Sequence, residues 1–295
     1  MPRALRAFAP AKVNLGLEVI RQRRDGYHDI ETIFQAVDLF DELTFQETDS
    51  TGELRLEVEG ARLPEGPENL VCRAHRLLVA KTGTDPPGVR VRLLKRIPVG
   101  SGLGGGSSDA AATLLALNRL WRLNLPQSEL SALAAQLGSD VPFFLIGGTA
   151  IGRGRGERLE ALPHLRRGAF LMVNPGFDIS SAWAYGQIKL GLTRNPYRIS
   201  VEQVKAFLAR FPASGMVMKN RLEDAVFPAH PSLGEIEEAL RECGAVHVSM
   251  SGSGSTLFGT FADAARAEIA REDLGDRWLS WVARPLPGGV RLEDA

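Results

Sequence analysis

The 295-residue sequence contains no uninterrupted apolar run of 18 residues and only two cysteines. The first absence argues against a transmembrane helix. Two isolated cysteines, Cys72 and Cys243, are too few for a disulfide framework or a cysteine-based zinc site. Basic and acidic residues balance at 35 each, so no global field favours nucleic acid or a membrane surface. We therefore expect no nucleic-acid or membrane partner. The expected oligomeric state is a monomer or weak homodimer.

The opening residues also lack the apolar core of a signal peptide, so the cytoplasm is the expected location. A hydrophobic fraction of 44% and a charged fraction of 24% are typical of a globular protein. This length can bury a sizeable core and favours two domains. A change of composition near residues 164–167 predicts the boundary, with one domain over residues 1–164 and a second over residues 165–295.

The second half reads strand, helix, strand, strand, helix, strand, with extra helices inserted after the first strand. This order predicts a ferredoxin-like sheet backed by helices. Ser200 and Gln203 have the spacing of a capping box and predict the start of one inserted helix. The expected strands cover residues 169–173, 246–250, 255–261 and 278–283, and the expected helices cover residues 233–243 and 262–271.

A glycine-rich stretch stands at the centre of the sequence, with five glycines in residues 100–106. An alternating strand pattern over residues 89–93 precedes it, and Ala and Leu at helical spacing follow it. Ser107–Asp109 supply predicted cap and first-turn residues of that helix. Glycines let backbone N–H groups approach an oxyanion, and a helix N-terminus adds partial positive charge. The pattern predicts a phosphate-binding loop, with a flexible loop before a capped helix as the alternative.

Three known phosphate loops do not fit this stretch. Gly100, Gly102 and Gly105 satisfy G-x-G-x-x-G, but a helix over residues 130–137 is predicted where a dinucleotide fold needs a second strand. A P-loop needs Gly-Lys-Ser/Thr, and residues 96–188 contain no lysine. A protein-kinase loop would require a later catalytic loop and D-F-G, which are absent.

Polar residues before the glycine stretch stand in two further patterns. The first predicted strand places Lys12 and Asn14 on one face, roughly 7 Å apart, which on its own is typical of a solvated face. The Asp25–Gly26 pair predicts a tight turn, with Tyr27 and His28 directly after it. Without further context, such residues beside a hairpin are usually surface residues.

Two segments after the glycine stretch also carry polar residues at fixed bends. Asp140 follows the predicted helix stop at Gly138 and precedes Val141, which the next proline restricts to extended geometry. A structural aspartate in a turn is the simplest interpretation of Asp140. The Ser-Gly-Ser-Gly loop over residues 250–256 lies between two predicted strands and reads locally as a loose hairpin.

Together these segments resemble a known superfamily. The run P-V-G-S-G-L-G-G-G-S-S from Pro98 to Ser108 resembles the phosphate loop of the GHMP kinases. A-P-A-K-V-N-L-G-L, from Ala9, resembles their first motif, and residues 250–256 resemble their third. D-G-Y-H-x-I-x-T-I-F-Q, from Asp25, and G-S-D-V-P-F-F resemble one branch, the 4-diphosphocytidyl-2-C-methyl-D-erythritol kinases.

The resemblance implies an α+β fold of two domains, an N-terminal domain like domain 2 of ribosomal protein S5 and a ferredoxin-like C-terminal domain. The active site is then expected between them. The implied reaction transfers the γ-phosphoryl group of ATP to the 2-hydroxyl of 4-diphosphocytidyl-2-C-methyl-D-erythritol with Mg²⁺, a step of the non-mevalonate isoprenoid pathway. Two rivals are a GHMP kinase for another small alcohol and a non-catalytic sensor of the same fold.

Roles are implied residue by residue where the motifs match. Lys12 is expected to be the active-site lysine and Asp140 the catalytic base, and the metal ligands stay unassigned. Tyr27 and His28 would hold the cytosine, with Tyr185 stacking on it and Trp183 as a rival. The remaining expected contacts are Asn69 and Lys95 to adenosine, Asn14, Ser251 and Gly252 to the erythritol end, and Pro98, Val99, Gly100, Ser101, Gly102, Leu103, Gly104, Gly105, Gly106, Ser107 and Ser108 to the ATP phosphates.

Overall fold

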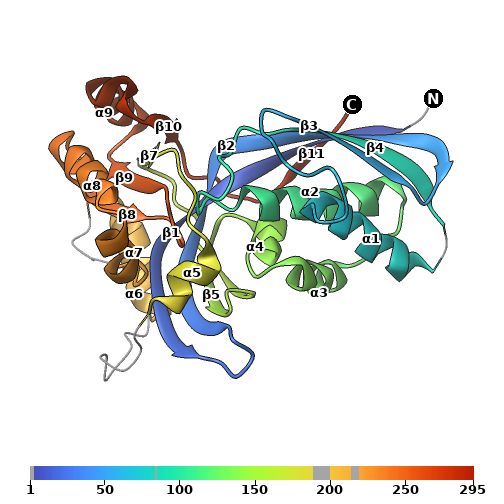
Figure 1. Cartoon of the computed structure of the whole chain (residues 1–295), viewed down its shortest axis with the longest axis horizontal. Coiled ribbons are helices and arrows are strands. Elements are labelled where there is room, and N and C mark those ends of the chain that lie inside the picture. Colours follow the sequence, from blue (N-terminus) through green and yellow to red (C-terminus); the bar gives the residue numbers. More distant parts are fainter. Residues whose placement is uncertain (1–2, 84, 189–199, 214–218) are drawn as a thin grey trace.

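The computed structural model describes residues 3–83, 85–188, 200–213 and 219–295. Within these ranges the chain forms a seven-stranded sheet and a four-stranded sheet. Figure 1 shows the larger sheet as a long curved layer with helices on one side, and the smaller sheet with its own helices at one end of it. The described helices include none that is long and apolar enough to cross a membrane.

Two long strands, β1 (Ala4–Gln22) and β2 (His28–Thr51), form the centre of the larger sheet. The predicted turn at Asp25–Gly26 joins them, and Gly26 has a φ of 84°, which favours glycine. Strand β2 pairs with β1 along most of its length, with β5 over residues 30–35 and with β4 over residues 42–51. The other strands of this sheet are β3 (Leu54–Glu59), β4 (Pro87–Leu94), β5 (Thr149–Gly154), β6 (Arg158–Leu162) and β11 (Arg291–Asp294).

Four helices cover one face of the larger sheet: α1 (Leu70–Thr82), α2 (Gly105–Leu120), α3 (Gln127–Leu137) and α4 (Val141–Ile146). The Ala and Leu residues of α2 are buried at the centre of this layer, so a flexible loop before a surface helix is not what the sequence encodes.

Two local predictions about these helix starts were wrong. Helix α2 begins at Gly105 with Gly104 as its N-cap, so Ser107–Asp109 lie inside the helix and do not cap it. The left-handed backbone of Gly104, with a φ of 76°, turns the chain into the helix earlier than the polar residues would. Val141 is not extended, because α4 begins there with a proline in its first turn, where no N–H partner is lost.

The smaller sheet has the strand order β10-β7-β9-β8, with all neighbours antiparallel. Helices α8 and α9 connect its strands in the predicted order, so the ferredoxin-like arrangement is confirmed. Ser200 and Gln203 make the predicted capping box at the start of α6. The elements are β7 (Ala169–Asn174), β8 (His247–Met250), β9 (Leu257–Phe261), β10 (Leu279–Ala283), α5 (Ser181–Gly186), α6 (Val201–Arg210), α7 (Glu223–Ala229), α8 (Ser232–Glu242), α9 (Ala264–Leu274) and the short η1 (Gly275–Arg277).

The two sheets share a core, and the last strand of the chain belongs to the larger sheet. Apolar residues of β1 and β2 pack with Phe170, Met172 and Phe258 of the smaller sheet. Strand β11, at the end of the chain, returns to the larger sheet and pairs with β1, so both termini lie at the same end of that sheet (Figure 1). The boundary after residue 164 stays a prediction, and β11 shows that the final residues belong with the first sheet.

Candidate active site

A cavity of about 850 Å³ lies where the two layers meet. Its lining comes from the β1–β2 hairpin, the segment with Leu63 and Leu70, the glycine loop, the start of α4, the turn between β5 and β6, the segment of α5 and the 250–256 loop. Most of the predicted site residues are among its lining. These are Lys12, Asn14, Tyr27, His28, Lys95, Pro98–Gly102, Gly104–Ser107, Asp140, Tyr185 and Gly252.

The glycine loop is fixed by backbone conformations that glycine alone adopts easily. Gly100, Gly102 and Gly104 have φ values of 63°, 79° and 76°. A Cβ on Gly102 would lie 2.0 Å from the carbonyl oxygen of Ser251, and one on Gly104 would lie 2.8 Å from Phe144 Cζ. The loop therefore needs these glycines both for conformation and for close packing.

The glycine loop contacts the 250–256 loop, which carries the third of the motifs that resemble those of the GHMP kinases. Ser251 Oγ donates to the carbonyl oxygen of Gly102 at 2.9 Å, and Thr256 N–H donates to that of Ser101 at 3.1 Å. The amide of Asn220 donates to the carbonyl oxygens of Met250 and Gly252, both at 2.7 Å. These hydrogen bonds fix the glycine loop so that the start of α2 faces the cavity. The N–H groups and partial positive charge of the helix start suit a phosphate group at this place.

Lys12 and Asp140 meet at the floor of the cavity. Lys12 Nζ lies 3.4 Å from Asp140 Oδ2 and donates to Asn14 Oδ1 at 2.5 Å. The Asn14 amide donates in turn to Thr32 Oγ1 at 2.7 Å. Lys12 is 3% exposed and the Asp140 side chain 32% exposed, so Lys12 lies on a buried polar face and not on the solvated face that its strand alone would suggest. Burial lowers the pKa of Lys12, and the nearby Asp140 carboxylate opposes this.

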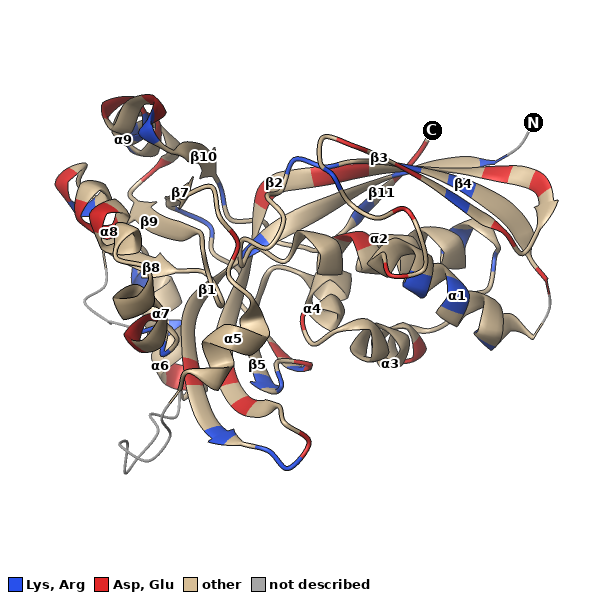
Figure 2. Cartoon of the chain, viewed as in Figure 1, with Lys and Arg blue, Asp and Glu red and all other residues tan. Residues whose placement is uncertain are grey.

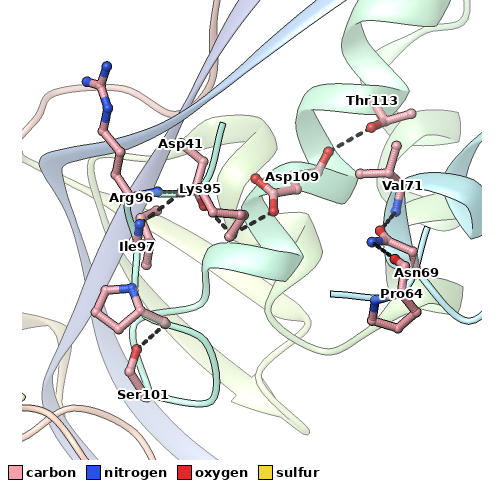
Figure 3. Close-up of polar contacts among 11 residues, drawn as sticks. Asp41, Pro64, Asn69, Val71, Lys95, Arg96, Ile97, Ser101, Asp109 and Thr113 are labelled. Carbon is pink, nitrogen blue, oxygen red and sulfur yellow. Dashed lines mark hydrogen bonds and ion pairs between the residues drawn. The ribbon is translucent and has the colours of Figure 1, made fainter. Parts of the chain in front are cut away.

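A second buried lysine lies behind the glycine loop (Figure 3). Lys95 Nζ donates to Asp109 Oδ2 at 2.8 Å and to Asp41. Asp41 Oδ1 also accepts the N–H groups of Arg96 and Ile97 at 2.6 and 2.9 Å. Burial lowers the pKa of Lys95, but the two carboxylates outweigh it and the net direction is upward. Burial, opposed by Lys95 and reinforced by Asp41, raises the pKa of Asp109 to about 7.

Neither residue predicted for adenosine is free in the structure. Lys95 lines the cavity but is engaged by its two carboxylates. Asn69 does not line it: its side chain caps α1 by accepting from Val71 N–H at 2.9 Å and donates to the carbonyl oxygen of Pro64 at 2.7 Å. The apolar Leu63 and Leu70 line this part of the cavity instead. The adenosine contacts stay a prediction.

Aromatic rings gather at the opposite end of the cavity. His28 and Tyr185 stack with ring centroids 5.3 Å apart and planes 22° apart. Tyr27 is 54% exposed, and Arg155 lies over its ring at 4.9 Å from the centroid. Trp183 packs edge-on against His230 and does not line the cavity. Burial lowers the pKa of His28, so its ring is neutral near pH 7 and has one donor and one acceptor nitrogen.

No cluster of three or more potential metal-ligating His, Cys, Asp or Glu side chains occurs in the described ranges. The Asp140 carboxylate and the Ser107 hydroxyl both line the cavity beside the glycine loop. Proteins usually hold Mg²⁺ with one or two carboxylates and the phosphates of a nucleotide. These oxygens therefore fit a magnesium ion that is bound mainly by its nucleotide.

Sequence reasoning missed three charged residues of the site. Asp41 and Asp109 hold Lys95 from β2 and α2, and this pairing of distant segments leaves no local pattern. Arg155 lies in the turn between β5 and β6, in a stretch noted only for its glycines. The pattern of a charged residue between two glycines, Gly154 and Gly156, could have identified Arg155 as a candidate site residue.

Two family descriptions match the sequence. "GHMP kinases N terminal domain" matches residues 69–148 and "GHMP kinases C terminal" matches residues 198–279. The chain is 44% identical over 285 residues to the 4-diphosphocytidyl-2-C-methyl-D-erythritol kinase of Syntrophus aciditrophicus, which covers 96% of this chain and 99% of the relative. It is 45% identical over 269 residues to that of Pelotomaculum thermopropionicum, over 90% of this chain and 92% of the relative.

Solved structures agree with these matches. A crystal structure of 4-(cytidine 5'-diphospho)-2C-methyl-D-erythritol kinase superposes with a TM-score of 0.83 at 39% identity, over 96% of this chain and all of the other. A homoserine kinase from Cytophaga hutchinsonii superposes with a TM-score of 0.73 over 99% of this chain and 98% of the other, and at 20% identity it shows the fold alone. The curated relatives are 44–45% identical to this chain over at least 90% of both sequences, and the glycine loop lies in the matched N-terminal domain. The chain therefore belongs to the 4-diphosphocytidyl-2-C-methyl-D-erythritol kinase family of the GHMP kinases.

Proposed function

We propose that this protein transfers the γ-phosphoryl group of ATP to the 2-hydroxyl of 4-diphosphocytidyl-2-C-methyl-D-erythritol, in the non-mevalonate route to isoprenoid precursors. The observation that carries the proposal is the arrangement of one cavity. Its aromatic end, with Tyr27, His28 and Tyr185, suits a pyrimidine base, and its other end combines a glycine loop with the Lys12–Asp140 pair.

The nucleotide phosphates bind at the start of α2. Backbone N–H groups of Gly104–Ser107 and the helix dipole supply positive charge without reorganisation. When bound, Mg²⁺ neutralises charge on the phosphates, with Ser107 and Asp140 as protein oxygens that fit it. ATP and Mg²⁺ as the bound species are part of this proposal.

Asp140 receives the proton of the acceptor hydroxyl, and Lys12 stabilises charge on the transferred group. The side chain of Asp140 faces the cavity, while Lys12 holds one of its oxygens at 3.4 Å. Phosphoryl transfer depends mainly on positioning and charge neutralisation. Asn14 and Gly252 lie beside Lys12 and contact the erythritol end: a Cβ on Gly252 would lie 3.2 Å from Lys12 Nζ and 3.3 Å from Asn14 Oδ1.

His28 and the two tyrosines give the specificity for the base. A neutral His28 can both donate to and accept from the cytosine edge. Tyr185, which stacks on His28 and lines the cavity, is placed to stack on the base, and Trp183 is not. The protein is further proposed to act in the cytoplasm as a monomer or weak homodimer.

A coupled assay of ADP release tests the function. Purified protein is given ATP, Mg²⁺ and either 4-diphosphocytidyl-2-C-methyl-D-erythritol, mevalonate, homoserine or galactose. Turnover of the cytidyl substrate with little activity on the other three is expected. Robust turnover of one of those three, with none on the cytidyl substrate, would identify a GHMP kinase for another alcohol, and no turnover at all would favour a sensor.

A further inference from the structure

Arg155 is a cation without a carboxylate partner in a cavity whose two lysines are neutralised. Lys12 is paired with Asp140, and Lys95 with Asp41 and Asp109. In the described part of the chain, no carboxylate lies within ion-pair distance of the Arg155 guanidinium, although Arg155 is half-buried and lines the cavity. A planar guanidinium in this setting is suited to a phosphate group, which it can bind through two parallel hydrogen bonds.

The backbone holds Arg155 at this place. Gly154 and Gly156 flank it in the β5–β6 turn, with φ values of 73° and 112°. Gly154 is paired with Ile30 of β2, two residues beyond His28, and this pairing brings the turn beside the β1–β2 hairpin. The Arg155 N–H is bonded to Glu157 Oε2 at 2.6 Å. The position of the Arg155 backbone beside the cavity is therefore set by the sheet and by this bond. Figure 2 shows charged residues of both signs around this hairpin.

Arg155 lies between the base end and the reacting end of the cavity. On one side its guanidinium is 4.9 Å from the centroid of the Tyr27 ring. On the other side, a Cβ on the next residue, Gly156, would lie 3.8 Å from Asp140 Oδ1. The order along the wall is aromatic ring, cation, catalytic carboxylate.

A cytidine diphosphate ester has the same order of groups: base, diphosphate, alcohol. We propose that Arg155 binds the diphosphate of the cytidyl substrate and thereby makes the site specific for a nucleoside diphosphate ester over the nucleoside alone. This inference rests on the proposed function, and it adds a residue that contacts the part of the substrate between the base and the reacting hydroxyl. The bound diphosphate then positions the hydroxyl near Asp140.

Binding of cytidine and of CDP to the full-length protein, measured by calorimetry without ATP or Mg²⁺, tests the proposal. In the wild type CDP should bind more tightly than cytidine, and rising salt should weaken CDP binding only. Arg155→Gln should lower CDP affinity ~10- to 100-fold, as expected for the loss of a hydrogen bond to a charged group. The same variant should lower cytidine affinity by less than about 2-fold. Arg158→Gln, an exposed position of the same hairpin outside the cavity, is the matched control and should leave both unchanged.

The steady-state assay adds a second readout. Arg155→Gln should raise the KM for the cytidyl substrate and leave the KM for ATP unchanged. An equal fall in cytidine and CDP affinity would reduce Arg155 to a support for Tyr27, and a raised ATP KM with normal CDP affinity would assign it to ATP. Either result overturns the proposal, as does a wild type that binds CDP no better than cytidine, even if the variant does not fold.

The two hypotheses fail in different ways. A wild type that binds neither cytidine nor CDP and releases no ADP with the cytidyl substrate would remove the proposed function and this inference together. A wild type that turns over the substrate, with an Arg155→Gln variant that keeps its preference for CDP, would remove the inference alone.

Discussion

The two ends of the cavity are built in opposite ways. At the phosphate end, Lys12 and Lys95 are 3% and 6% exposed, and glycines pack against backbone atoms. At the base end, Tyr27 is 54% exposed and packs against one guanidinium. The phosphate end is thus part of the core, so its residues act on folding as well as on catalysis, whereas an exposed residue of the base end such as Tyr27 should act mainly on binding.

This difference predicts that substitutions at the two ends of the cavity will change different measured quantities. Changes to buried charges at the phosphate end should affect kcat or the free energy of unfolding by several kcal/mol. Changes at the base end should affect substrate affinity and leave unfolding nearly unchanged. The following variants test the contrast.

Asp140→Asn should have the largest effect on activity. The amide keeps the shape of the carboxylate but cannot accept the hydroxyl proton, so kcat should fall ~10²- to 10⁴-fold. ATP binding should change little, because the glycine loop is held by other contacts. Single-turnover kinetics and the KM for ATP check this expectation.

Lys12→Met is the companion variant, since Lys12 and Asp140 are bonded to each other. Its loss in kcat should not add to that of Asp140→Asn in the double variant, because the two residues act as a unit. An Asp140→Asn enzyme that keeps kcat within a few-fold would contradict the base role. Asp140 would then orient the substrate, and Lys12 would be the main catalytic side chain.

Lys95→Met should destabilise the fold by about 3–5 kcal/mol, the usual cost of removing one partner of a buried ion pair. The variant leaves Asp41 and Asp109 buried without their cation. Lys81→Met is the matched control: Lys81 pairs with Glu129 at 2.8 Å, but both side chains are more than 40% exposed, so its effect should stay below about 1 kcal/mol. Urea unfolding of both variants decides the matter, and equal midpoints would show that the buried cluster contributes no more than a surface pair.

The sequence predicted the fold and the glycine loop well because both depend on local signals. Alternation marked β4, helical spacing marked α2, and the order of elements marked the ferredoxin-like sheet. The resemblance to a known family added the position of Lys12 and Asp140 in one cavity. Their catalytic roles stay predictions, which the Asp140→Asn and Lys12→Met variants test.

What the sequence did not predict depends on contacts between distant segments. Lys95 was assigned to adenosine from the family resemblance, and nothing near it in the sequence reveals its partner Asp41, 54 residues earlier. The capping by Ser107–Asp109 was wrong since Gly104 starts the helix through its backbone conformation. Arg155 reaches Tyr27 only because β5 pairs with β2. Charge pairing across a sheet and backbone conformation at a single glycine are not visible in residue spacing.

Tyr27→Ala should weaken cytidyl substrate binding by ~1–3 kcal/mol, the range found for base–aromatic stacking. Because Tyr27 is largely exposed, the free energy of unfolding should change by less than about 0.5 kcal/mol. Trp183→Ala, another exposed aromatic that does not line the cavity, is the control and should bind normally. Calorimetry with cytidine measures both. If Trp183→Ala lost more cytidine affinity than Tyr27→Ala, the base would have to bind on the other side of α5, beside Trp183.

Asp109→Asn should have an effect on stability that depends on pH. Two carboxylates share one lysine in the buried cluster, and the pKa of Asp109 rises from its ordinary value near 3.8 to about 7. Between these values the folded protein holds a proton that the unfolded chain has released, so wild-type stability should fall as pH rises from about 4 to 7. The slope from this group is at most about 1.4 kcal/mol per pH unit.

Asparagine at position 109 removes this titration while its oxygen can still accept from Lys95. The stability of Asp109→Asn relative to wild type should therefore improve steadily from pH 5 to pH 7, because over that window only the wild type must release a proton from position 109 on unfolding. Urea midpoints of both proteins across this range measure it, with Asp294→Asn, an exposed partner of Arg119, as the control that should show no such trend. A constant difference between Asp109→Asn and wild type would mean that Asp109 is ionised throughout, and that Lys95 neutralises both carboxylates behind the glycine loop.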